Sequence, residues 1–133
     1  MRRVMHVLLA AVVLLAVACG KPAAPDPNEV AGRAAKAYYD YLLHGKYAAY
    51  VDGFYRPDSI PPSYREQLIV SAKQYVFQLR QDHGGLKAVA VAGARADTAR
   101  HTGHAFLSLC FGDSTREQIV VPLVLHNGNW MLR

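Results

Sequence analysis

The chain ends in TARHTGHAFLSLCFGDSTREQIVVPLVLHNGNWMLR, residues 98–133, and this stretch decides the fold class. Apolar and polar residues alternate along much of it, which is typical of strands that bury one face. The segments GDST (112–115) and HNGN (126–129) interrupt the alternation, and Asn-Gly is a preferred dipeptide of hairpin turns. We therefore predict strands at 98–111, 116–125 and 130–133, joined by tight turns.

One more strand precedes this stretch. LKAVAVA (86–92) has the strand period, and GARAD (93–97) is predicted as the turn that follows it. Pro122 has no N–H to donate to a ladder, so it indicates an edge position or a bulge. Gly103 would let the long strand bend. Together these segments predict a four-stranded antiparallel meander.

Helical periodicity replaces the strand period before residue 86. Asp26 can cap a helix that has Pro27 at its first position and Glu29 reaching back. The predicted helix ends before Gly45 and is followed by a short helical piece at 46–51. The apolar stripe of the predicted first helix consists of Val30, Ala31, Ala34, Tyr38, Tyr41 and Leu42.

A third and longer helix follows the break RPDSIPPS (56–63). Ser63 and Glu66 form a second predicted capping box, and Gly84 ends the helix after about Asp82. Helices followed by a meander predict an α+β domain, in which N-terminal helices pack on one face of an antiparallel sheet.

Two segments carry a resemblance to a known family: AAKAYYDYLLHGKYAAYVDGF (34–54) and the tail from residue 97 onward. They resemble the nuclear-transport-factor-two-like superfamily, which includes SnoaL-type cyclases and ketosteroid isomerases. More closely, they are similar to small bacterial envelope lipoproteins of unknown function with that fold. The resemblance covers most of residues 27–133 and implies a curved, cone-shaped, cystatin- or SnoaL-like sheet.

The first residues have the pattern of an export signal. MRR is a basic start, and the apolar stretch from Val4 to Val17 is too short to span a membrane stably. LLAVAC (14–19) resembles the lipobox of bacterial lipoproteins, in which Cys19 would carry the lipid. An ordinary signal peptide and an uncleaved anchor are the alternatives.

This pattern divides the chain into three parts. We expect a signal peptide at 1–18, a lipidated Cys and flexible tether at 19–26, and the domain at 27–133. GKPAAPDP (20–27) is rich in Pro and Ala, as tethers are. Gly20 stands where Asp retains enteric lipoproteins at the inner membrane. By that resemblance the expected location is the cell envelope, at the outer membrane facing the periplasm.

The charge balance argues against nucleic acid as a partner. The chain has 15 Lys and Arg against 10 Asp and Glu, a net charge of +5. Removing Arg2 and Arg3 with the leader leaves 13 against 10, or +3, and the remaining basic residues are scattered. Cys110 is the only cysteine besides Cys19, so we expect it to be a small buried hydrophobe without a disulfide.

The histidines do not suggest a metal site. His101 and His104 are three residues apart in a predicted strand, so they point to opposite faces and cannot chelate together. The sequence predicts neither a metal nor a cofactor.

Catalysis is also disfavoured. Isomerases of the resembled superfamily place an Asp base and a Tyr or second acid in an apolar cone. Asp40 lies among tyrosines, but helical phasing puts it away from the apolar stripe, four residues after Lys36. We therefore predict an ion pair there and no catalytic residue, with an isomerase- or cyclase-like enzyme as the alternative.

The tyrosines suggest a binding site, since tyrosine offers rigid area and a hydroxyl. The alternative is that they only edge a small core, and Trp130 is expected to lie in that core. The expected function is an envelope lipoprotein that binds a small ligand or an envelope protein, or that is an accessory subunit, with a second copy of the chain as a further partner. The residues expected to line a pocket are Tyr38, Tyr41, Tyr50, Tyr64, Tyr75, His101 and His104.

Overall fold

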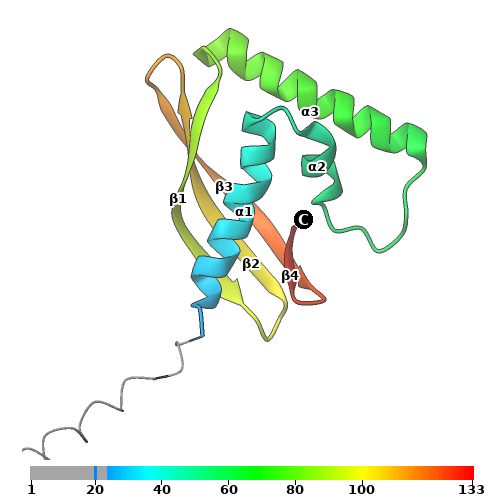
Figure 1. Ribbon diagram of the computed structural model, residues 1–133, viewed down its shortest axis with the longest axis vertical. Coiled ribbons are helices and arrows are strands. Elements are labelled where there is room, and N and C mark those ends of the chain that lie inside the picture. The colour runs from blue at the N-terminus through cyan, green and yellow to red at the C-terminus, as the bar shows by residue number, and fades with distance from the viewer. Residues whose placement is uncertain (1–19, 21–23) are drawn as a thin grey trace, which may run out of the picture.

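The computed structural model describes Gly20 and residues 24–133 (Figure 1). The predicted signal peptide and Cys19 lie outside the described residues. The chain forms three helices and four strands in the order α1 (Pro27–Leu43), α2 (Tyr47–Asp52), α3 (Pro62–His83), β1 (Leu86–Asp97), β2 (Thr102–Phe111), β3 (Arg116–His126) and β4 (Asn129–Leu132).

The four strands form one antiparallel sheet in the order β1-β2-β3-β4. Figure 1 shows the sheet curving around α1, which lies across one of its faces, while α2 and α3 lie beyond α1. The prediction of an α+β domain with helices on a curved four-stranded sheet is confirmed.

The main core lies between α1 and the sheet. Alternate residues of β2 turn inward and are buried, including Leu107 and Leu109, and they pack with Ala31 and Ala35 of α1. Trp130 of β4 is buried in the same cluster, as predicted. A second cluster joins the three helices and consists of Leu42, Val51, Ile69, Ala72 and Val76.

Most of the predicted helix ends are confirmed. The carboxylate of Asp26 accepts a hydrogen bond from the N–H of Asn28 at 2.9 Å, which caps α1. Gly84 has a left-handed backbone with φ 75°, and the N–H of Gly85 bonds the carbonyl of Leu79 at 3.1 Å.

The predicted capping box of α3 was wrong. The helix begins at Pro62, and no side chain caps it. Proline is pre-set for the first helical position, because its φ is already helical and it lacks the N–H that would be left unpaired there. The helix therefore begins before Ser63, which lies inside its first turn.

The prediction of a turn at GARAD was also wrong. β1 continues through residues 93–97, and a register shift between Val91 and Gly93 absorbs the irregularity as a bulge. The turn lies instead at residues 98–101, so β2 begins at Thr102 rather than at 98. His101 belongs to this turn, with a left-handed φ of 57°.

Pro122 lies on an inner strand but at a local edge position, as predicted, and not at a bulge. β3 pairs with both β2 and β4, but the pairing with β4 ends at Leu123 opposite Leu132. The carbonyl of Pro122 accepts the N–H of Arg133 at 3.2 Å, which shows that its backbone faces the β4 side just past this end. The missing N–H therefore interrupts no ladder.

In the turn between β3 and β4, Asn127 and Gly128 have φ 50° and 78°, as the Asn-Gly hairpin prediction requires.

Candidate functional site

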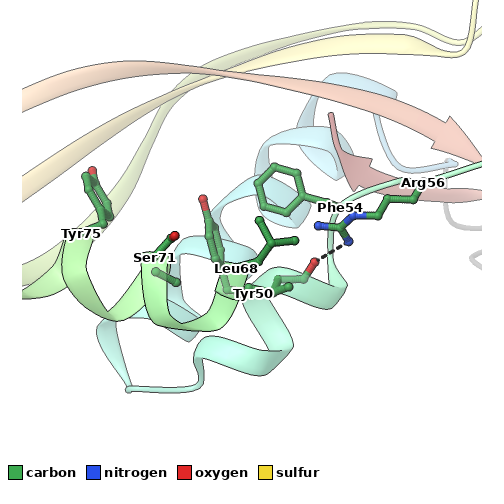
Figure 2. A pocket seen from close by; sticks show the side chains of 8 residues that line it. Tyr50, Phe54, Arg56, Leu68, Ser71 and Tyr75 are labelled. Carbon is green, nitrogen blue, oxygen red and sulfur yellow. Dashed lines mark hydrogen bonds between the residues drawn. The ribbon is translucent and has the colours of Figure 1, made fainter. Parts of the chain in front are cut away.

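An apolar groove of about 300 Å³ lies beside α2 and α3 (Figure 2). Two segments form its walls: residues 50–56, and one face of α3. The lining residues are Tyr50, Val51, Phe54, Arg56, Leu68, Ser71, Ala72 and Tyr75.

The first wall is held in place by β4. α2 ends at Asp52, with Gly53 as its C-cap, and the next residue, Phe54, forms a parallel bridge with Leu132. The N–H of Leu132 bonds the carbonyl of Gly53 at 2.9 Å, and the N–H of Tyr55 bonds the carbonyl of Leu132 at 2.7 Å. These backbone bonds fix the segment that carries Phe54 and Arg56 against the end of the sheet.

The second wall follows from the helical period of α3. Leu68, Ser71, Ala72 and Tyr75 recur at the spacing that places side chains on one helix face. Ile69 and Val76, on the adjoining face, are buried in the cluster shared with α1 and α2. That contact holds α3 beside α2, while Figure 1 shows the long helix running past the sheet without lying flat on it. The face of α3 that carries Tyr75 therefore remains open.

Aromatic rings connect the groove to the helical core. Tyr50 meets Phe54 edge to face, with ring centroids 5.3 Å apart, and meets Tyr39 at 5.8 Å. Burial raises the pKa of Tyr39, Tyr50 and Tyr75. The tyrosine hydroxyls are therefore neutral at physiological pH and can both donate and accept hydrogen bonds.

Arg56 is the one charged residue of the lining. Its Nη1 donates to the carbonyl of Val51 at 3.1 Å, and its guanidinium carbon lies 5.7 Å from the ring centre of Phe54. The nearby Arg65 pairs with Asp52 through two hydrogen bonds of 2.8 and 2.9 Å. These hydrogen bonds hold the pKa of Asp52 below its usual value, with a smaller contribution from the charge of Arg56.

The structure separates the residues that we expected to line a pocket. Tyr50 and Tyr75 line the groove. Tyr38 and Tyr41 line a different hollow, between α1 and the β3–β4 turn, where the hydroxyl of Tyr38 donates to the carbonyl of Trp130 at 2.8 Å.

The other three lie apart from both. Tyr64 is exposed near the start of α3 and does not line the groove. His101 is exposed in the β1–β2 turn. His104 is exposed on the sheet face opposite the helices, because it alternates with the inward-facing Gly103 and Ala105. Within the described part of the chain, neither histidine approaches the groove.

Other predicted features have clear positions. Lys36 and Asp40 form the expected ion pair, at 2.6 Å. Cys110 was expected to be buried but is only partly so, because it points to the uncovered face of the sheet between the inward-facing Leu109 and Phe111. Among the residues that the structure describes, no three His, Cys, Asp or Glu side chains gather as a metal site would require.

Six lining residues were missed from the sequence: Val51, Phe54, Arg56, Leu68, Ser71 and Ala72. Leu68 recurs with Ala72 and Tyr75 at helical spacing, so this spacing was a usable signal. Arg56 gave no such signal. It follows the second helix in a segment that reads only as a break, and its position depends on the bonds to β4.

Comparisons with known proteins bear on the fold. No family model matches the chain, and no curated protein matches it. Within the described residues, no helix has the length and apolar character needed to cross a membrane.

One solved structure is similar over most of both chains. It is the crystal structure of a Campylobacter jejuni protein named as a candidate NTF2-like transpeptidase, where NTF2 stands for nuclear transport factor two. The TM-score is 0.59 at 10% sequence identity, and the match covers 74% of this chain and 92% of the other. At this identity the likeness shows the fold alone. The described domain has the NTF2-like fold.

Proposed function

We propose that the domain is a binding module that holds a small, mostly apolar ligand in the groove between α2 and α3. The observation that carries this proposal is the lining itself: about 300 Å³ of space bordered by aromatic and aliphatic side chains, with few polar groups. Apolar sites with a small number of placed polar groups are typical of small-molecule binding. In this domain, the bonds to β4 and the helical core hold the walls of the groove in place. A site formed before binding reduces the entropy lost on binding.

The make-up of the lining favours binding over the isomerase- or cyclase-like alternative. General acid–base catalysis by this kind of site requires a carboxylate or imidazole within hydrogen-bond reach of the substrate. Among the described residues, the groove lining contains no such group. Asp52 lies nearby but is held by Arg65, and Asp40 is paired with Lys36.

We further propose that the domain works at a membrane surface of the bacterial envelope, through a lipid on Cys19. The support is the sequence pattern at residues 1–19 and the Pro- and Ala-rich segment that follows it. The first helix of the domain begins at Pro27, the last residue of this segment. The outer membrane, on its periplasmic side, is the proposed location.

Photolabelling tests the binding function on the full chain. The purified protein is placed in phospholipid vesicles and irradiated with a medium-chain alcohol that carries a diazirine, and labelled peptides are identified by mass spectrometry. We expect labels on residues 50–56 and 68–75. Ser71→Trp should suppress them, because Ser71 is an exposed residue of the lining and the indole would fill the groove.

The matched control is Gln74→Trp. Gln74 is also exposed on α3 but does not line the groove, so this variant should be labelled like the unmodified chain. Labels spread over the surface and equal in all three proteins would contradict the proposed function.

A further inference from the structure

The two ends of the groove carry different side chains. Figure 2 shows the side chains of Tyr75, Ser71, Tyr50, Leu68, Phe54 and Arg56 following one another along it. Arg56 reaches back over the groove at one end, and Tyr75 lies at the other. A ligand that fills the groove therefore has one end beside a guanidinium and its remaining length beside apolar side chains.

The charge of Arg56 is not matched by a carboxylate. The ion pairs of the described residues join Lys36 to Asp40, Arg65 to Asp52 and Glu66, His83 to Asp113, and Arg100 to Asp97, and Arg56 is in none of them.

The guanidinium nevertheless has only partial access to water. Arg56 is half-buried, and its one hydrogen bond to a described residue goes to the carbonyl of Val51. A partly desolvated cation favours an anionic partner, because the ion pair replaces hydration that the cation has already lost. The remaining N–H groups are suited to a carboxylate, which can accept two of them in parallel.

The neighbouring acids do not remove this preference. Asp52 gives both of its oxygens to Arg65, so the two charges largely cancel. Asp58 is exposed in the adjoining hollow and is not in an ion pair with Arg56. Arg56 is therefore the guanidinium at this end of the groove that no described carboxylate holds in an ion pair.

The lining residues at the opposite end, Ser71 and Tyr75, carry no charge. Glu117 of β3 pairs in register with the inward-facing Leu109, so it lies on the helix side of the sheet. Burial is the main cause of the raised pKa of Tyr75, and the charge of Glu117 adds to it. Among the described residues, Arg56 is the one charged residue of the lining, so we expect an acid to enter with its carboxylate toward that end.

We propose that the ligand is a monocarboxylic acid with an apolar body, with its carboxylate on Arg56 and its body along Phe54, Leu68 and Tyr75. This inference rests on the proposed binding function and adds the chemical class of the ligand. Ser71 is placed beside the apolar body, where its hydroxyl can bond a polar substituent.

The test compares a diazirine-bearing fatty acid with the alcohol of equal chain length, on the full chain in vesicles. Labelling of residues 50–56 and 68–75 is measured against probe concentration in the unmodified protein and in Arg56→Gln. We expect Arg56→Gln to weaken labelling by the acid about tenfold and to change labelling by the alcohol less than about twofold. Because each probe is compared with itself across variants, its partitioning into the vesicles cancels.

Two further variants isolate the cause. Arg56→Lys keeps the charge but not the planar fork, so it should retain part of the preference for the acid. Lys73→Gln removes an equal charge from an exposed position of α3 outside the groove lining, and it should leave both probes unchanged.

The outcomes separate the two proposals. Equal labelling of the groove by acid and alcohol, with no effect of Arg56→Gln on either, would overturn the acid preference and leave the binding function standing. Absence of groove labelling by both probes would overturn the binding function itself. A loss of folding in Arg56→Gln would weaken labelling by both probes, so a selective loss of labelling by the acid is informative even if the variant alters stability.

Discussion

The indole of Trp130 on β4 occupies the space that a side chain at Gly103 on β2 would need. A methyl group on Gly103 would lie 3.0 Å from Cζ3 of Trp130 and 3.1 Å from the carbonyl oxygen of Arg95. β3 lies between these two strands, so the indole reaches across it. Gly103 therefore provides room for the largest side chain of the core, which is a different role from the strand bend expected from the sequence.

Gly103→Ala should destabilise the domain by about 1–3 kcal/mol, the usual cost of adding a methyl group to a packed core. The indole is buried in the core and the Arg95 carbonyl belongs to the backbone of β1, so we expect neither to shift without cost. The control is Gly93→Ala, because its methyl group would meet only Phe106 at 3.9 Å, an ordinary contact distance. Urea denaturation measures both variants, and equal midpoints for the two would contradict the packing argument.

Trp130→Ala should cost about 3–5 kcal/mol, the range for large aromatic residues in cores. Trp130 is 6% exposed, whereas Phe77 of α3 is 56% exposed. Phe77→Ala is therefore the matched aromatic control and should change stability by less than about 0.5 kcal/mol. The melting temperatures of the two variants distinguish these effects, and an unchanged value for Trp130→Ala would mean that the indole is not part of the core.

Stability should fall as the pH rises above about 10, the ordinary tyrosine pKa. Burial raises the pKa of Tyr39, Tyr50 and Tyr75 in the folded chain, so folding favours their neutral forms. Their contribution is complete below the pKa of the unfolded chain and is lost as the pH rises toward the raised values. Tyr39→Phe should make the fall in melting temperature with pH shallower. A slope identical to that of the unmodified protein would show that Tyr39 does not contribute to the loss of stability at high pH.

Cys19→Ser should abolish incorporation of a fatty-acid label and leave an unprocessed precursor. A lipobox cysteine is the site of acylation, and several acyl chains, at about 0.8 kcal/mol per buried CH₂, hold a protein firmly on a bilayer. Cys110→Ser is the control, since it removes the only other cysteine and should leave labelling intact. Gel mobility and metabolic labelling in cells measure the result. Full labelling of the Cys19→Ser chain would contradict the proposed anchor.

Much of the fold could be predicted because its signals are local. The alternation in β2, the Asn-Gly turn before β4 and the glycine that ends α3 each depend on neighbouring residues only. The β1–β2 turn was misplaced because Gly93 is typical of both turns and bulges. The pairing partner decides between the two, and it is not visible in β1 alone.

The groove was less predictable for the same reason. Tyr75 and Leu68 share a helix face, which the period shows, but whether that face is covered depends on where α3 lies relative to the sheet. Arg56 reaches the groove only because Leu132, at the far end of the chain, binds the backbone on both sides of Phe54. Such a contact between distant segments leaves no mark in the local sequence.

The length of α1 sets how far the groove stands from the point where the chain enters the domain. The chain enters at Pro27, whereas Tyr39, which contacts Tyr50 of the groove, lies about 18 Å further along the helix axis. Figure 1 shows the entry point and α3 at opposite ends of the molecule. If Cys19 is the anchor, as proposed, the helix would act as a spacer, and we would expect the groove to take its ligand from the aqueous compartment rather than directly from the bilayer.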